Sequence, residues 1–207
     1  MMTPLKGIDI SKHNIIRDWE KVSKQIDFVI MRAGGNYNGF YKDSTFERNY
    51  NACKMYNIPC GAYYDAGKAF IGPETGKEYA EHFRQLLSGH VFELPVYLDI
   101  EVTPKKFKKL ITDAAVAFCE HLENNKYFAG IYGSDISTFH DMLFADQVSA
   151  YTLWVARYGV KPKYIKQYGI WQFSSKGSID GIVGNVDLDY AYNDFEKIIK
   201  GVHLNGY

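Results

Sequence analysis

Eight short apolar runs, most of them separated by segments with helical periodicity, are the feature of this 207-residue chain that most constrains its fold. The runs are nearly continuous in apolar residues, which is typical of strands buried on both faces in a parallel sheet. Strands that alternate with helices predict an α/β fold, and eight of them predict a TIM-barrel-like (β/α) barrel. The expected strands cover residues 5–10, 27–33, 58–64, 94–101, 128–132, 152–156, 169–173 and 186–188.

Helical periodicity is uneven along the chain. The last three strands follow one another with little helix between them, so we expect an irregular barrel with fewer helices than strands. Thr103 is the expected N-cap of the longest helix, with Pro104 at its first position, and Ser11 or Asn14 could cap the segment that begins at Trp19. The expected helices cover residues 46–56, 75–87, 103–125 and 194–200, with a further short helix after Ser134.

The composition excludes several classes of protein. The 24 basic and 24 acidic residues leave no net charge, so nothing indicates a nucleic-acid partner. Aromatic residues make up 16% of the chain. Surplus Tyr and Trp suit a cleft that binds flat, amphipathic ligands such as sugar rings, although a Tyr-rich core would account for the same content.

Cysteine and histidine spacing gives no sign of a metal site or a cofactor. Cys53, Cys60 and Cys119 are odd in number and lack metal-ligand spacing, so we expect buried free thiols and no metal.

No apolar run is long enough for membrane insertion, and the N-terminus has no signal-peptide pattern. We therefore expect a chain made in the cytoplasm without a signal peptide, which would need to be released to act outside the cell.

The fourth apolar run ends in two carboxylates separated by one residue, Asp99 and Glu101. Alternate residues of a strand share a face, so the two acids should stand side by side. Carboxylates roughly 5–7 Å apart in a cleft raise the pKa of at least one of them, which costs stability unless a protonated acid is needed near neutral pH. A solvated strand end without function is the alternative for this pattern alone.

The ends of the other strands add further candidates, because active sites of β/α barrels lie at the carboxyl ends of the strands. Asp9 and Asp187 join Asp99 and Glu101 to make four carboxylates. Several acids with aromatic neighbours match what glycoside hydrolysis requires, namely a proton donor, negative charge near the reacting carbon and platforms for sugars. The candidate substrate-binding residues at these ends are Arg32, Tyr63, Tyr64, Tyr132, Trp154, Trp171 and Gln172.

Structural roles are alternatives for several of these residues. Asp9 could cap a helix or bond a turn. Asp189 shares a strand face with Asp187, so one of the two could be structural. Arg32 is expected to pair with one of the acids and hold it ionised, in preference to touching substrate. Both tryptophans lie inside apolar runs and are as consistent with the core as with a sugar platform.

A series of short motifs runs along the chain: GIDIS at residues 7–11 with His13, Asp18-Trp19, FVIMRAGG at 28–35, GAY at 61–63, LDIE at 98–101, LWVA at 153–156, WQFS at 171–174, Gly181 and GNVD at 184–187. With these motifs the sequence resembles the glycoside hydrolase family 25 lysozymes, the muramidases common among bacteriophage lytic enzymes. The matching motifs follow the family's order and span nearly the whole chain. Two departures concern substrate contacts: Asn14 stands where members often carry Gln, and Tyr64-Asp65 replaces a common His and aromatic pair.

The resemblance implies a modified β/α barrel that cleaves the β-1,4 bond between N-acetylmuramic acid and N-acetylglucosamine in bacterial peptidoglycan. The family's general acid would fall on Glu101, with Asp99 as its carboxylate partner and Asp9 and Asp187 as the other two acids. We expect residues 1–207 to form a single catalytic domain, without a separate wall-binding module in this chain.

The role of Asp99 is open between two routes. Asp99 could attack the sugar directly, or it could orient the substrate's own 2-acetamido oxygen as the nucleophile. We favour the second route, because two acids on one strand do not flank the scissile bond from both sides, and either route predicts retention. The alternatives for the whole chain are a carbohydrate-binding barrel that has lost catalysis and a chitin-type hydrolase; the residues before Asp99 lack the longer D-x-x-D-x-D-x-E pattern, which weakens the latter.

Overall fold

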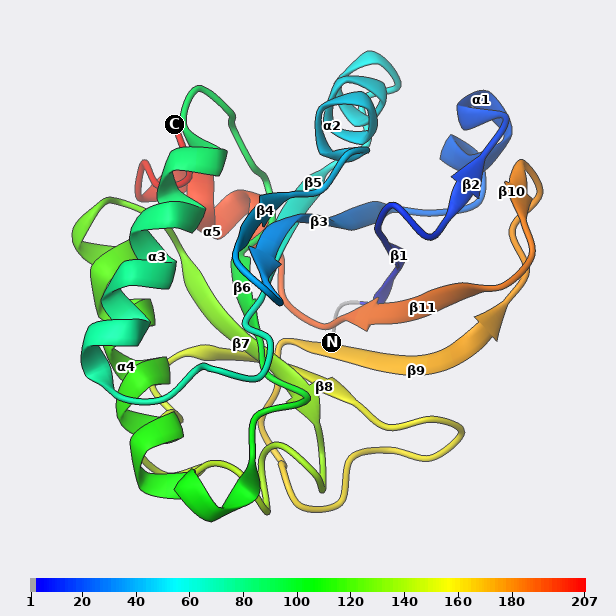
Figure 1. The fold of residues 1–207 in the computed structure, drawn as a ribbon. Coiled ribbons are helices and arrows are strands. Elements are labelled where there is room, and N and C mark those ends of the chain that lie inside the picture. The colour runs from blue at the N-terminus through cyan, green and yellow to red at the C-terminus, as the bar shows by residue number, and fades with distance from the viewer. Residues whose placement is uncertain (1–2) are drawn as a thin grey trace.

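Eight strands close into a barrel in the computed structural model, which describes residues 3–207 (Figure 1). The order around the barrel is β1-β11-β9-β8-β7-β6-β5-β3, and pairing of β3 with β1 closes it. All eight expected strands are present, which confirms the predicted α/β barrel. Their bounds are β1 (Leu5–Ile10), β3 (Phe28–Asn36), β5 (Cys60–Asp65), β6 (Val96–Asp99), β7 (Ala129–Ser134), β8 (Thr152–Ala156), β9 (Ile170–Gly177) and β11 (Val186–Ala191).

Strand β11 departs from the expected parallel sheet, because it runs antiparallel to both of its neighbours, β1 and β9. The reason lies in the connection. A parallel neighbour needs a long crossover, usually a helix, whereas β9 and β11 are joined by a short segment that contains only β10 (Ile182–Val183). The short β4 (Phe40–Lys42) also pairs antiparallel, with the end of β3, and β10 pairs with β2 (Ile15–Ile16) in a small separate ribbon.

The helices cover only part of the barrel. α3 (Pro73–Leu87) and α4 (Lys108–Asn124) pack against each other on one side, and α2 (Phe46–Met55) packs against β3 (Figure 1). The short α1 (Trp19–Ser23) follows β2, and α5 (Phe195–Gly201) follows β11. The prediction of few and uneven helices is therefore confirmed, and no helix of the described residues is long and apolar enough to cross a membrane.

Two expected helix caps and one expected helix were wrong. A 3₁₀ turn (Lys105–Phe107) precedes α4, and the Thr103 hydroxyl donates to the Gly67 carbonyl instead of capping the helix. α1 is capped by Asp18, whose side chain accepts from the Lys21 N–H. After Ser134 the chain forms turns and no helix. Several N–H groups there bond the carbonyl five residues back, whereas an α-helix bonds the carbonyl four residues back, so the turns are wider than those of an α-helix.

The alternation of side chains along each strand divides the core into two parts. Inward residues fill the barrel itself, among them Phe28, Tyr97 and Trp154. Outward residues of the same strands, such as Val29 and Leu98, pack beneath the helices. Only inward residues near the carboxyl ends of the parallel strands can reach a pocket in the barrel mouth.

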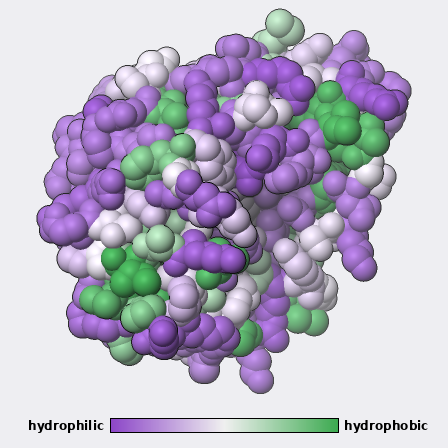
Figure 2. Space-filling view, viewed as in Figure 1, coloured by the Kyte–Doolittle hydropathy of each residue, from purple (hydrophilic) through white to green (hydrophobic). Residues whose placement is uncertain are grey.

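The face of the molecule seen in Figure 2 is largely hydrophilic. An apolar patch stands over the β2–β10 ribbon, where Ile15 and Val183 are exposed.

Candidate active site

A pocket of about 280 Å³ opens at the carboxyl ends of the parallel barrel strands. All four carboxylates expected from the sequence line it, although they come from β1, β6, the segment after β6, and β11. β11 contributes its first residues, because its reversed direction brings its beginning to this end of the barrel. The lining residues are Asp9, Tyr63, Asp99, Glu101, Tyr132, Trp154, Tyr158, Gln172, Ser175 and Asp187.

The carboxylates lie at different depths. Asp9 pairs in register with Asp187 across β1 and β11, and Asp99 is the last residue of β6. Asp9 is 7% exposed and Asp99 is 8% exposed, so both lie in the wall of the pocket. Glu101 is exposed and lies two residues beyond the strand, which was expected to include it. The two acids of the Asp-x-Glu pattern therefore differ in solvent access, with Glu101 at the mouth.

Burial raises the pKa of all four acids, and nearby negative charges raise it further for Asp9, Asp99 and Glu101. Burial and the Asp187 charge raise the pKa of Asp9 to about 8. Burial and the Glu101 charge hold the pKa of Asp99 well above its ordinary value. Loss of solvent at the pocket mouth, together with the Asp65 and Asp187 charges, raises the pKa of Glu101, and burial raises the pKa of Asp187. A carboxylic acid that keeps its proton near neutral pH is what general-acid chemistry requires.

Gln172 connects the acids to the aromatic residues. Its Nε2 donates to Oδ2 of Asp9 over 2.7 Å, and its Oε1 accepts from the hydroxyls of Tyr132 at 2.9 Å and Tyr158 at 3.1 Å. These contacts fix which way the buried amide points. The Tyr132 ring packs on the Trp154 ring at a centroid distance of 4.3 Å, so an aromatic floor supports the network.

Three of the expected substrate-binding residues lie outside the pocket, and alternation along the strands explains two of them. Tyr64 and Trp171 are the chain neighbours of Tyr63 and Gln172, which take the inward positions, and adjacent strand residues point to opposite sides. Tyr64 is fully buried beneath α3, where its hydroxyl bonds a histidine ring of that helix. Trp171 faces outward, and its indole N–H donates to the Arg157 carbonyl. Tyr63, Tyr132, Trp154 and Gln172 do line the pocket.

Arg32 pairs with an acid that the sequence analysis did not consider. Its Nε donates to Oδ2 of Asp43 over 2.8 Å, and its Nη1 lies 3.9 Å from Asp65. Burial acts to raise the pKa of Asp43, but hydrogen bonds from the backbone of Thr45 and Lys12 and from Arg32 outweigh burial and lower it. The expectation that Arg32 pairs with one of the four pocket acids was therefore wrong. Arg32 lines a neighbouring pocket with Lys12, His13, Tyr37, Tyr41 and Asp65.

Sequence reasoning missed two residues of the pocket. Tyr158 lies in the loop after β8, and Ser175 lies in β9, which extends to Gly177 and not only to Phe173. Tyr158 is two residues beyond Ala156 and four beyond Trp154, both of which are inward residues. The same alternation, continued past the strand end, would have identified Tyr158.

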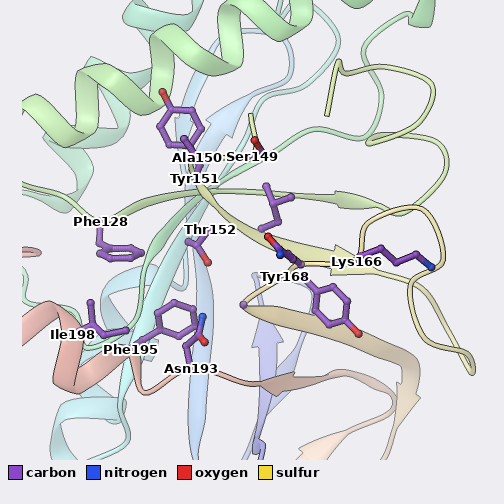
Figure 3. Close-up of a pocket in the computed structure, with 13 residues that line it drawn as sticks. Phe128, Ser149, Ala150, Tyr151, Thr152, Lys166, Tyr168, Asn193, Phe195 and Ile198 are labelled. Carbon is purple, nitrogen blue, oxygen red and sulfur yellow. The ribbon is translucent and has the colours of Figure 1, made fainter. Parts of the chain in front are cut away.

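A larger hollow, of about 490 Å³, lies at the opposite end of the barrel, near the first residues of β8 and β9 (Figure 3). Phe128, Thr152, Phe195 and Ile198 lie around it. None of the 13 described residues that line it is Asp or Glu. The acid groups that hydrolysis of a glycoside needs are therefore at the other end, in the smaller pocket.

A closed β/α barrel whose mouth holds several carboxyls of raised pKa above an aromatic floor is the arrangement of a glycoside hydrolase. Glycosyl hydrolases family 25 matches residues 8–182, and the chain belongs to this family. The resemblance inferred from the motifs is thereby confirmed.

Comparison with individual proteins agrees with this assignment. The chain is 28% identical over 187 residues to the autolytic lysozyme of Clostridium acetobutylicum, an alignment that covers 89% of this chain and 55% of that protein. The chain therefore spans about half the length of that relative. The structure of the CTP1L endolysin is 29% identical, with a TM-score of 0.80 over 95% of this chain and 70% of that one.

The fold also matches the catalytic domain of endolysin ply40 from bacteriophage P40 of Listeria monocytogenes. The TM-score is 0.80 at 23% identity, and the match covers 97% of this chain and 99% of that domain.

Proposed function

We propose that this chain is a retaining N-acetylmuramidase that hydrolyses the β-1,4 bond between N-acetylmuramic acid and N-acetylglucosamine in bacterial peptidoglycan. The observation that carries the proposal is the convergence of Asp9, Asp99, Glu101 and Asp187 in one pocket with an aromatic floor. The similarity to an autolytic lysozyme and an endolysin supports peptidoglycan as the substrate and the cell wall, after release of the protein, as the place of action.

Glu101 is the proposed general acid. It lies at the mouth of the pocket, where its carboxyl can reach the oxygen of a bound glycosidic bond, and its raised pKa keeps the proton available. Glu101 protonates the leaving oxygen as the bond to C1 breaks. It then accepts a proton from the water that attacks C1 in the second step, which restores the acid.

Asp99 is the proposed partner of the substrate's own acetamido group. Its Oδ1 is buried and accepts no hydrogen bond from the described residues. A substrate N–H could fill this acceptor, which would direct the acetamido carbonyl oxygen toward C1. Asp99 and Glu101 come from the same strand end, so they approach a sugar from one side, whereas direct attack by Asp99 needs the opposite face. These two features support substrate assistance over direct attack.

The other two acids and the aromatic side chains would act on the sugar ring. Asp9 and Asp187 face each other across β1 and β11. Because burial and the Asp187 charge raise the pKa of Asp9 to about 8, the ionised member of this pair supplies the negative charge near the carbon that becomes cationic in the transition state. Tyr63, Tyr132 and Trp154 line the same pocket and can contact the apolar face of a sugar.

Digestion of purified peptidoglycan by wild type and by Glu101→Gln tests the proposal. We expect new reducing ends of N-acetylmuramic acid with wild type and a loss of about 10²–10⁴-fold in the variant, the range of general acid–base catalysis. Glu120→Gln is a matched control, because Glu120 is exposed on α4, far from the pocket.

The products distinguish the competing functions. Reducing ends of N-acetylglucosamine would contradict a muramidase, and binding without cleavage would indicate a carbohydrate-binding barrel. Proton NMR of the first product anomer tests the stereochemistry. An initial α-anomer would contradict both retaining routes, because inversion requires a different use of the acids.

A further inference from the structure

Asp189 is a buried acid for which the proposed reaction has no direct use. It lies two residues after Asp187 on the inward face of β11, opposite Gly7 in β1 and Gln172 in β9. Its side chain is completely buried, and it does not line the pocket. Asp189 therefore lies one layer below the pocket, inside the barrel.

The two oxygens of Asp189 have different surroundings. Oδ1 accepts a hydrogen bond of 2.7 Å from the indole N–H of Trp154. Oδ2 is buried and receives no N–H or O–H donor from the described residues. An ionised carboxylate with a bare oxygen inside a barrel would be strongly unfavourable, because a buried charge needs a cation or several donors.

A proton on Oδ2 of Asp189 removes the buried negative charge and so the need for further donors. The neutral acid needs an acceptor for its O–H, and the Asp9 carboxyl is within side-chain hydrogen-bonding reach of Asp189. Burial and the nearby Asp9 charge hold the pKa of Asp189 well above its ordinary value, which agrees with the geometric argument. Asp9 then accepts from two buried donors, Asp189 and Gln172.

We propose that Asp189 is a positioning residue, which stays protonated throughout the pH range of activity and donates to Asp9, and so orients Asp9 and favours its ionised form. The inference rests on the proposed function only where it concerns the use of Asp9 in hydrolysis. The hydrogen bond from Asp189 acts against burial and the Asp187 charge, which raise the pKa of Asp9, and so moderates that increase.

Other titratable groups lie near the pair of Asp9 and Asp189. Asp187 lies on the same strand, and the charges of Glu101 and Asp99 come from the end of β6. The tyrosines that sense the charge of Asp9 or Asp189 are Tyr63, Tyr97, Tyr132 and Tyr158.

Two substitutions of Asp189 separate positioning from mere structural support. Asp189→Asn retains an acceptor for Trp154 and an N–H donor for Asp9, and so reproduces the protonated acid. Asp189→Leu has the same branched arrangement of four non-hydrogen side-chain atoms, although it is larger, and it has neither group. We expect Asp189→Asn to keep kcat, KM and the pH profile close to wild type. Asp189→Leu should lower kcat by about 10–100-fold, because a hydrogen bond to a charged group is lost, and change KM little.

Carbon-13 NMR of labelled aspartate carboxyls gives a readout that does not depend on activity. The Asp189 signal, assigned by its absence in Asp189→Asn, should remain that of a protonated acid across neutral pH. The Asp9 titration should be the same in Asp189→Asn and move to higher pH in Asp189→Leu, because the anion loses a donor. Thermal unfolding and circular dichroism check that the variants fold.

The outcomes are distinct. An Asp189 signal that titrates below neutral pH, or a folded Asp189→Asn as inactive as Asp189→Leu, would overturn the inference. If Asp189→Leu does not fold, the NMR titration of wild type and Asp189→Asn decides alone. Failure of the proposed function would appear instead as an inactive wild type or a fully active Glu101→Gln, with the Asp189 titration unaffected.

Discussion

Gln172 and Asp9 are 163 residues apart in the sequence, and the amide Nε2 of the first donates to Oδ2 of the second over 2.7 Å. Two tyrosine hydroxyls bond the amide oxygen, so the amide can present only its N–H groups to the acid. The relationship makes Gln172 part of the electrostatic control of Asp9, because a donor favours the ionised form of a carboxyl.

Substitution Gln172→Leu should therefore impair activity through Asp9. We expect kcat/KM to fall by about 10–100-fold and the pKa of Asp9 to rise, because a hydrogen bond to the carboxylate is lost. Stability should also decrease by about 1–3 kcal/mol, since the buried hydroxyl of Tyr132 loses its partner. Steady-state kinetics and chemical denaturation measure the two effects. Gln167→Leu, at an exposed position on the opposite end of the barrel, should change neither.

The pH dependence of hydrolysis should respond to Asp65. A general acid must be protonated, so activity declines as the pH rises through the pKa of Glu101. Desolvation of Glu101 is the largest cause that raises this pKa, and the Asp65 charge is the second. Asp65→Asn removes the charge, lowers the pKa of Glu101 and should move the alkaline limb of the kcat/KM profile to lower pH. Asp113→Asn, at a half-buried position of α4 outside the pocket, is the control. An unmoved limb in Asp65→Asn would contradict the role of Glu101.

Asp99→Asn should stabilise the protein while it abolishes most activity. The pKa of Asp99 is raised in the folded state, so the unfolded state releases the proton first and stability declines as the pH rises above about 4, the ordinary pKa of Asp. Asp99→Asn has no group to ionise, so its stability does not decline in this way. We expect its free energy of unfolding to exceed that of wild type by roughly 1–3 kcal/mol at pH 7. Denaturation of both proteins at acid and neutral pH measures this gain. A difference in stability between the variant and wild type that is the same at both pH values would contradict the role of Asp99 ionisation.

The Arg32–Asp43 pair should have the opposite pH dependence. The pKa of Asp43 is lowered in the folded state, so its contribution is present above the unfolded pKa and is lost as the pH falls through the folded value. Arg32→Leu leaves a buried carboxylate without its cation, and we expect a loss of about 3–5 kcal/mol at neutral pH. Urea unfolding across the acid range should show the difference between wild type and variant shrinking as Asp43 takes up a proton.

Tyr158 should contribute to substrate binding more than to chemistry. Its ring lines the pocket and is half exposed, so it can contact a sugar directly. Tyr158→Ala should raise KM by about 3–10-fold with a smaller change in kcat, because an aromatic contact of this kind contributes about 0.5–1.5 kcal/mol. Tyr158→Phe should retain most of the binding. Tyr164→Ala in the same loop, outside the lining of the pocket, is the matched control.

The sequence contains enough information to predict the strands, and the reason is physical. Runs such as residues 152–156 are buried on both faces, so their apolar content identifies them without knowledge of their partners. The end of such a run then indicates where a side chain such as Asp99 lies, because all parallel strands present the same end to the pocket.

Features that depend on partners distant in the sequence could not be predicted in this way. The pairing of Arg32 with Asp43 and the hydrogen bond from Thr103 to Gly67 are set by packing between elements. The orientation of Tyr64 and Trp171 is a different kind of error. Strict alternation from the inward residues Tyr63 and Gln172 would have placed both on the outside.

The reversed direction of β11 makes the position of one proposed catalytic acid depend on the length of a hairpin. Asp187 faces the pocket because the segment between β9 and β11 brings it into register with Asp9 of β1, whereas the pairing of β11 with β9 contains register shifts on either side of Leu188. In the parallel strands a helix can absorb an inserted residue before the next strand begins. In this hairpin a slip by one residue would exchange the two faces and point a leucine at the sugar. Residues 178–185, which join the two strands, should therefore tolerate substitutions far better than changes of length, apart from Gly181 and Gly184, whose φ angles are positive.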